Sequence, residues 1–406
     1  MRVLKIIAIL LSSFLLVPEL YSCTTAVVSG RYTVDGRPLL WKHRDTGTED
    51  VKLMYFDDGE YAYLGLVNSS DSSGSEVWAG TNSAGFSIMN SASYNLKDSK
   101  TENEDQEGFF MKEALKQCKD LNDFESFLKK TSGPRGIEAN FGVIDAMGGV
   151  AYYECDDTSY VKYDANDPAH APFGYIIRTN YSFNRNVQDG YGYIRYQTAD
   201  KLFYDAVAAG ELSAPFILTK CDRNLTHSLT GTDLTKVPMP RSGSAAQFVH
   251  FEDYINRYSS ASSTVVHGVR PGENASHTTL WTMPGFPLCS VAVPTWVIAG
   301  EDLPKILTAN AGSHSPLCDK VVALKRRCFP ISRGSGKKYL NQAVLMNQNG
   351  DGVLQLLPEL ENSIFQCTAE KMERWRDRGM NVAEIKSLYR WIDETVTAAY
   401  EEHFGL

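Results

Sequence analysis

Residues 23–29 read CTTAVVS and residues 38–45 read PLLWKHRD, two short runs on either side of a turn sequence. The first run is apolar and rich in β-branched side chains, which is typical of a strand. The Asp35-Gly36 pair between the runs favours a tight turn. We therefore expect a strand, a hairpin-type connection and a second strand that ends at residues 42–45.

Residues 1–22, which precede the first run, have the pattern of a secretory signal peptide. Arg2 and Lys5 provide the positive charge, residues 6–17 form an apolar run too short to span a membrane, and Ser22 is a small residue suited to cleavage. We expect cleavage before Cys23 and export to the periplasm or the outside of the cell. No later run reaches the roughly 20 apolar residues of a membrane helix, so no membrane span is expected.

The composition is that of an ordinary globular protein, with 43% hydrophobic and 11% aromatic residues among 406. A formal net charge of −9 without a basic run disfavours nucleic acid as a partner. We find no internal repeat and no linker long enough to divide the chain. Residues 23–406 are therefore expected to form a single domain, with a C-terminal helical extension at about residues 366–406.

The hydrophobic periodicity changes several times between the period of strands and that of helices. Further strands are predicted at residues 53–56, 61–67, 86–90, 139–144, 150–154, 175–179, 262–269, 278–282 and 290–297. Helices are predicted at residues 106–130, broken near Asp120, and at residues 193–209, 214–221 and 367–404, the last divided at residues 379–381. Strand-rich blocks alternating with helices indicate an α+β layered architecture.

A cysteine at a mature N-terminus carries its own base. The free α-amine titrates at about 7.7 to 8.0, so at pH 7 a fraction of it is neutral and able to take the thiol proton. Cys23 is therefore a candidate nucleophile, and no histidine is required. The eight cysteines have no CxxC spacing, and we interpret most of them as buried apolar residues. No metal or organic cofactor is implied, and disulfide pairing and oligomeric state stay open.

A second interpretation of Cys23 belongs to another functional class. Residues 20–23 also approximate the lipoprotein pattern, in which the cysteine thiol carries diacylglycerol and its amine is acylated. The chain would then be a lipid-anchored binding protein on an outer membrane surface. The bulky Tyr21 and the absence of a flexible tether before the first strand disfavour this alternative.

Several motifs resemble those of the N-terminal-nucleophile cysteine hydrolases. Cys23-Thr24-Thr25 and the strand that ends at Asp45 resemble their opening, in which the second strand closes with Arg-x-x-Asp; here Lys42 replaces the arginine. Residues 80–90 resemble their Gly-x-Asn-x-x-Gly turn and following strand, which ends at Asn90. Residues 177–181 resemble the later strand closed by Thr-Asn, at Asn180. The superfamily includes choloylglycine hydrolases, penicillin V acylases, acyl-CoA:6-aminopenicillanic acid acyltransferases and dipeptidases.

The resemblance implies a four-layered αββα sandwich, here with additional C-terminal helices, and a set of site residues. Cys23 would be the nucleophile, and Asp45 would hold its α-amine. Lys42, or Arg44 in its place, would supply the cation beside the thiolate. Asn90 and Asn180 would contact the substrate carbonyl. The late arginine of the family is not assigned, and Asp145 and Glu154 are interpreted as structural.

The expected function is hydrolysis of a linear amide bond of a small N-acylated molecule, through an acyl-enzyme on Cys23. Acyl transfer or dipeptide cleavage are the alternatives within the superfamily. Bile-salt, penicillin-type, N-acyl amino acid and dipeptide amides all stay open. Four aromatic residues beside the proposed site strands are candidates for an acyl pocket or for the core: Trp41, Phe86, Tyr181 and Phe183.

Overall fold

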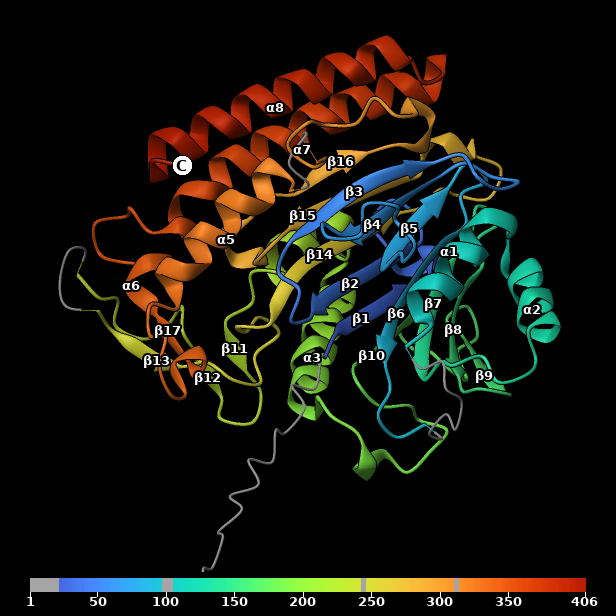
Figure 1. Cartoon of the computed structure of the whole chain (residues 1–406), viewed down its shortest axis with the longest axis horizontal. Coiled ribbons are helices and arrows are strands. Elements are labelled where there is room, and N and C mark those ends of the chain that lie inside the picture. Colours follow the sequence, from blue (N-terminus) through green and yellow to red (C-terminus); the bar gives the residue numbers. More distant parts are fainter. Residues whose placement is uncertain (1–21, 97–104, 242–245, 310–313) are drawn as a thin grey trace, which may run out of the picture.

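The computed structural model describes residues 22–96, 105–241, 246–309 and 314–406. It contains four layers, in which two antiparallel sheets face each other and helices cover the outer face of each (Figure 1). The expected αββα sandwich is therefore what the chain forms. The signal-peptide prediction falls almost entirely on residues 1–21, outside the described residues.

The first sheet carries the N-terminal cysteine motif at its second strand. Its six strands are antiparallel and are ordered β10 (Tyr175–Arg178), β1 (Thr24–Val28), β2 (Leu39–Asp45), β14 (Ser260–His267), β15 (Thr279–Pro284) and β16 (Val293–Thr295). The connection between β1 and β2 includes a short 3₁₀ turn and Gly36 at φ 74°, a backbone conformation that glycine adopts without strain. The hairpin predicted from residues 23–45 is confirmed.

The second sheet is a simple meander of seven antiparallel strands. They follow the order of the chain: β3 (Val51–Phe56), β4 (Tyr63–Asn68), β5 (Ala79–Asn82), β6 (Ser87–Ala92), β7 (Ala139–Ile144), β8 (Val150–Cys155) and β9 (Tyr160–Asp164). The turn between β5 and β6 depends on Gly85 at φ 82° and on the Asn82 carboxamide, whose oxygen accepts bonds from the Ala84 and Phe86 amides. The residue pattern 80–86 therefore encodes this turn.

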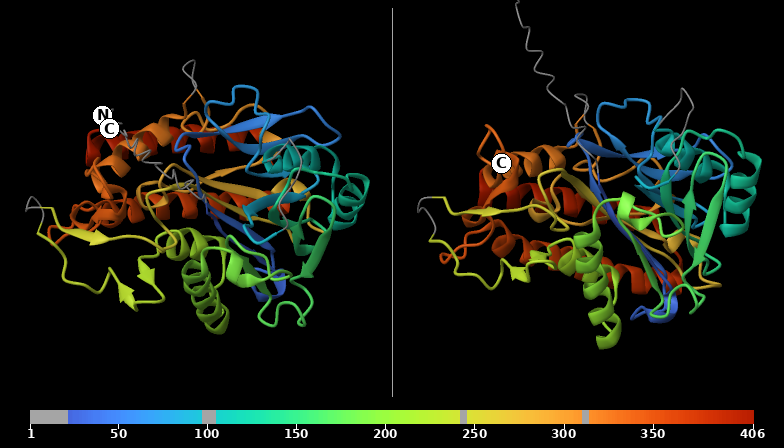
Figure 2. Two further views of the ribbon diagram at one scale, coloured as in Figure 1. Left: turned by 60° about the horizontal axis from the view of Figure 1, so that its bottom comes forward. Right: turned by 90° about the horizontal axis from the view of Figure 1, so that it is seen from below.

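Helices cover the second sheet on one side and the first sheet on the other (Figure 2). Helices α1 (Glu107–Gln117) and α2 (Leu121–Lys130) bury phenylalanines against the outer face of the second sheet, and Asp120 caps α2, as the predicted break required. The first sheet is covered by α3 (Tyr193–Ala209), α5 (Pro316–Cys328), α7 (Val353–Arg378) and α8 (Val382–Phe404). Trp375 of α7 packs edge-on against Trp296, with ring centroids 5.3 Å apart.

The inner faces of the two sheets meet closely beside β1. Gly142 of β7 has no side chain there, and a Cβ at that position would lie 3.0 Å from Val27 Cγ1 and would collide with Met89. Tyr152 of β8 donates a hydrogen bond of 2.7 Å to Thr25 Oγ1, which in turn donates to the Arg178 carbonyl. This chain of bonds ties the second sheet to β1 and β10 within two residues of Cys23.

Some elements differ from the sequence prediction. Strand β16 is shorter than expected, and β9 and α5 were not predicted. The helical tail begins at Val353, before the expected residue 367, but it divides at residues 379–381 as predicted. Among the described residues, no helix is both long enough and apolar enough to cross a membrane.

Candidate active site

The strand register places Cys23 between a cation and an amide. The last β1–β2 pair is Thr24 with His43, so one residue further Cys23 lies opposite Arg44. The β1–β10 pairing ends at Thr25 with Arg178, so an extension by two residues brings Cys23 opposite Asn180. Cys23 is 8% exposed. Residues opposite one another share a face of the sheet, so the side chains of Cys23, Arg44 and Asn180 lie in one row across three strands.

Lys42 shares that face and reaches across to the second sheet. Its Nζ donates to Asn90 Oδ1 at 2.6 Å and to the Trp78 carbonyl at 2.7 Å. Burial lowers the pKa of Lys42 to about 7, while the charge of a Cys23 thiolate raises it. The amine of Lys42 therefore titrates near neutral pH and responds to the state of the thiol.

Arg44 lies two residues along β2 and stacks on Trp78. Its guanidinium carbon is 4.6 Å from the ring centroid, within the range of a cation–π contact. Burial lowers the pKa of Arg44, and a Cys23 thiolate again opposes this shift. The charge of a Cys23 thiolate therefore acts on both cations of β2, and which of them stabilises the thiolate stays a prediction.

Asp45 is held beside the peptide bond that precedes Cys23. Its Oδ2 accepts from Arg257 Nε at 3.0 Å and Nη2 at 2.7 Å, and its Oδ1 accepts from Ser260 Oγ at 2.6 Å. Arg257 Nη2 also donates to the Ser22 carbonyl at 3.2 Å. The Asp45–Arg257 pair therefore contacts the bond whose cleavage would free the α-amine of Cys23.

Arg195, from α3, ties Cys23 to Asn180. Its Nη1 donates to the Cys23 carbonyl at 2.6 Å and to Thr24 Oγ1 at 2.9 Å, and its Nη2 donates to Asn180 Oδ1 at 2.9 Å. Arg195 is fully buried, and burial lowers its pKa. The Asn180 amide nitrogen donates to the Ala92 carbonyl at 2.9 Å, so both ends of this carboxamide have partners.

The four residues predicted to assist Cys23 lie around it, but their contacts differ. Lys42 donates to the side-chain oxygen of Asn90, so the amide nitrogen of Asn90 is the atom that can donate to a substrate. Asp45 reaches the Ser22–Cys23 bond through Arg257. Asn180 is held by Arg195. Their roles toward a substrate stay predictions.

Sequence reasoning missed Arg195 and Arg257. Arg195 precedes Ala199 and Phe203 at intervals of four on the buried face of α3, so a charge in an apolar helical stripe was the available signal. Arg257 lies just before β14 in a segment without periodicity, and nothing in the sequence marks it. Arg241, another arginine in this part of the sequence, is exposed.

Other candidate residues have structural roles. Asp145 accepts bonds from the Leu121, Met147 and Gly149 amides, and Glu154 pairs with Arg178 at 2.7 Å, so both structural interpretations are confirmed. Trp41 stacks on Phe203 of α3, and Phe86 packs against Phe124 of α2. Neither aromatic residue therefore faces the space between the sheets.

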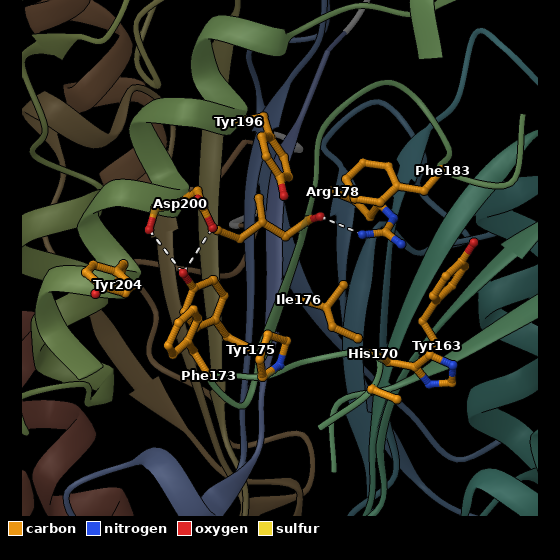
Figure 3. Close-up of a pocket in the computed structure, with 13 residues that line it drawn as sticks. Tyr163, His170, Phe173, Tyr175, Ile176, Arg178, Phe183, Tyr196, Asp200 and Tyr204 are labelled. Carbon is orange, nitrogen blue, oxygen red and sulfur yellow. Dashed lines mark hydrogen bonds between the residues drawn. The ribbon is translucent and has the colours of Figure 1, made fainter. Parts of the chain in front are cut away.

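A cavity of about 350 Å³ lies on the far side of β10 from β1, between β9 and α3 (Figure 3). Phe183, Tyr163 and Arg178 form its inner wall, and the Arg178 guanidinium stacks 4.0 Å from the Phe183 ring centroid. Arg178 already bonds Glu154 and the Ile177 carbonyl, so its polar atoms face the protein. Cys23 does not line this cavity.

One cluster elsewhere has metal-ligand residue types. Asp50, His314 and Asp319 offer three ligand atoms within 4.8 Å of one another, with His314 Nδ1 at 3.2 Å from Asp319. Two of the three side chains are exposed, and none belongs to the site around Cys23.

No protein-family profile matches the chain, and no curated protein matches it. Solved structures do match. An N-acylethanolamine-hydrolyzing acid amidase ortholog of Caenorhabditis elegans is 15% identical, covers 48% of this chain and 87% of its own, and has a TM-score of 0.34. A conjugated bile acid hydrolase variant of Clostridium perfringens is 12% identical, with coverages of 68% and 93% and a TM-score of 0.35.

A penicillin V acylase of Agrobacterium tumefaciens is also 12% identical, with coverages of 68% and 86% and a TM-score of 0.33. Bile acid hydrolases and penicillin V acylases are among the enzymes that residues 23–45 resemble.

Proposed function

We propose that the chain is an exported cysteine amidohydrolase, active once cleavage after Ser22 makes Cys23 its N-terminus. The observation that carries this proposal is the set of contacts at the Ser22–Cys23 bond. Arg257, paired with Asp45, donates to the carbonyl before this bond, and Arg195 donates to the carbonyl after it. Polar groups thus hold both sides of the residue that would supply the thiol and the amine.

The proposed reaction begins with transfer of the thiol proton to the α-amine. The sulfur then attacks the substrate carbonyl, and the Asn90 amide nitrogen donates a hydrogen bond to the oxyanion in this scheme. Collapse breaks the C–N bond, and the leaving nitrogen takes the proton from the α-amine. Water then hydrolyses the thioester and regenerates Cys23. Lys42 and Arg44 stabilise the thiolate by charge in this scheme.

The test combines the mass of the mature chain with the activity of two variants. We expect an unmodified chain that begins at Cys23, loss of amide hydrolysis in Cys23→Ala, and loss or a large reduction in Cys23→Ser. Full activity of a correctly processed Cys23→Ala protein would remove Cys23 from the reaction. A mass increased by diacylglycerol and a fatty acyl group would instead support the lipid-anchored alternative.

An added amine distinguishes hydrolysis from acyl transfer within the same proposal. A hydrolase releases the free acid in the presence of a competing amine, whereas an acyltransferase forms the new amide. Product analysis by mass spectrometry with a panel of bile-salt, penicillin-type, N-acyl amino acid and dipeptide amides identifies both the reaction and its substrate class.

A further inference from the structure

Arg44 is a buried cation without a carboxylate partner. It is 4% exposed, its Nη1 has no hydrogen-bond partner, and no ion pair to it is found in the part of the chain that the structure describes. Arg37 pairs with Glu273 and Arg178 with Glu154. Arg195 has no carboxylate partner either, but it donates to the Cys23 carbonyl, Thr24 Oγ1 and Asn180 Oδ1, whereas Arg44 Nη1 bonds to nothing among the described residues. Glu76 is the acid that interacts with Arg44, and it does so only at longer range. Burial of a charge without a counter-charge costs free energy, so the burial of Arg44 calls for a functional explanation.

Two further hydrogen-bonding groups beside Arg44 are also unused. Ser262 of β14 lies opposite Arg44 in the β2–β14 register and is 1% exposed, and its Oγ has no partner among the described residues. Trp78, on which Arg44 stacks, has a buried Nε1 that likewise bonds to nothing described. The guanidinium and the indole only donate hydrogen bonds. Three unsatisfied groups that can donate, with one positive charge, match a monovalent anion.

This donor set adjoins the proposed nucleophile. Arg44 comes opposite Cys23 when the β1–β2 pairing is extended by one residue, and adjacent strands are roughly 4.8 Å apart. If an anionic group bound at Arg44 and the carbonyl attacked by the Cys23 sulfur belong to one substrate, only a few covalent bonds separate them. An N-acyl amino acid has this arrangement, because its α-carboxylate is separated from the scissile carbonyl by the nitrogen and Cα.

We propose that Arg44, Ser262 and Trp78 form a subsite for a substrate carboxylate, so that the preferred substrates are N-acyl amino acids. This inference rests on the proposed function and deepens it. Arg44 then has a counter-charge in the complex, and its planar guanidinium binds a carboxylate with two parallel hydrogen bonds. A role for Arg44 in stabilising the thiolate alone predicts the same effect on every amide, whereas carboxylate binding predicts an effect on charged substrates only.

The first experiment compares the mature enzyme on two substrates that differ at one group. N-octanoylglycine carries the carboxylate, and N-octanoylethanolamine has a hydroxymethyl group in its place; amine release gives kcat/KM for each. We expect wild type to prefer the glycine conjugate by about 10²-fold or more, since a site built for a polar group rejects analogues that lack it. In Arg44→Met this ratio should fall close to one, and Arg44→Lys should retain part of it.

The matched control is Lys52→Met, which removes another buried cation. Lys52 lies on β3 and donates to the Ser69 carbonyl at 3.0 Å, away from Cys23. It should keep the wild-type substrate ratio. An unchanged ratio in Arg44→Met, or equal rates of wild type on the two substrates, overturns the subsite while leaving amide hydrolysis intact.

The second experiment measures binding and does not depend on turnover. Calorimetric titration of N-octanoylglycine into the folded Cys23→Ala protein should give an affinity that falls by about 10- to 100-fold in Cys23→Ala/Arg44→Met, the range expected for hydrogen bonds to a charged group. Equal affinities in the two proteins overturn the subsite. If the wild-type enzyme hydrolyses neither these two amides nor any amide of the panel above, but the binding difference is found, the hydrolase proposal fails and the carboxylate subsite stands.

Discussion

Lys42 is the residue whose titration connects stability to pH. Its folded-state pKa is about 7, against 10.5 for an unperturbed lysine. Between these two values the unfolded chain binds more protons than the folded chain, so the free energy of unfolding rises with pH. The cost of burying this lysine is therefore largest below pH 7 and is relieved in alkaline solution.

Replacement of Lys42 by methionine should remove this dependence. We expect wild type to gain stability relative to Lys42→Met by up to about 1.4 kcal/mol for each pH unit between pH 7 and 10. Urea unfolding of both proteins at several pH values measures the difference, in which titrating groups that do not interact with Lys42 cancel. Parallel curves would show that Lys42 is not the group responsible.

Asp45 is a buried carboxylate whose charge is matched by an arginine. Its side chain is fully buried, and it accepts hydrogen bonds from Arg257 and Ser260. Asp45→Asn leaves the Arg257 charge without its partner, and we expect a loss of about 3 kcal/mol in the free energy of unfolding together with a fall in kcat. Denaturant unfolding and steady-state kinetics provide the two measurements.

The control for this variant is Asp205→Asn on α3. Asp205 pairs with Lys201 at 2.7 Å, but both side chains are more than half exposed. The change should therefore cost less than about 1 kcal/mol and should leave turnover as it is. A similar loss in both variants would contradict the importance assigned to burial at Asp45.

At the scale of single elements, β8 presents two neighbouring tyrosines to opposite faces of the second sheet. Tyr152 points inward and donates to Thr25 Oγ1, whereas Tyr153 points outward and donates to Glu125 Oε1 at 3.2 Å. Both rings are buried. The Tyr152 hydroxyl therefore supports the strand that follows Cys23, whereas the Tyr153 hydroxyl only stabilises a helix.

Removal of either hydroxyl should cost about 1 kcal/mol of stability, because each makes one hydrogen bond. Only Tyr152→Phe should also lower kcat, since Thr25 is two residues from Cys23 and its position depends on this bond. Turnover measured on the folded fraction at one temperature distinguishes the two. Equal kcat in Tyr152→Phe and Tyr153→Phe would show that β1 does not require this support.

Elements with a strong local pattern could be predicted, and those without one could not. Strands β1 and β2, the turn at Gly85 and the break at Asp120 follow from residues next to one another in the chain. Helix α5 was missed although Leu317, Val321 and Leu324 have helical spacing, so an available signal was left unused. Arg257 could not be found at all, because its bond to Ser22 joins residues 235 positions apart.

At the scale of the whole molecule, the tail helices stabilise the first sheet from outside. Trp375 is 2% exposed, contacts Trp296 and donates to Glu384 of α8. Trp375→Ala opens a large cavity far from the inner face of that sheet. It should lower the free energy of unfolding by about 3–5 kcal/mol and leave kcat per folded molecule unchanged.

Urea unfolding and active-site titration measure these two effects of Trp375→Ala. The exposed neighbour Arg374, changed to alanine, serves as the control and should alter neither. A fall in kcat per folded molecule in Trp375→Ala would mean that the tail helices also shape the space around Cys23.

The long sequence separation of the contacts to Cys23 has a consequence for biosynthesis. The thiol lies in the first strand to leave the ribosome, but Arg195 follows 172 residues later and Arg257 later still. A growing polypeptide therefore carries its sulfur long before the two arginines that bond the carbonyls of Ser22 and Cys23. The set of groups around the cysteine is therefore complete only once Arg257 has been made, when well over half of the protein exists.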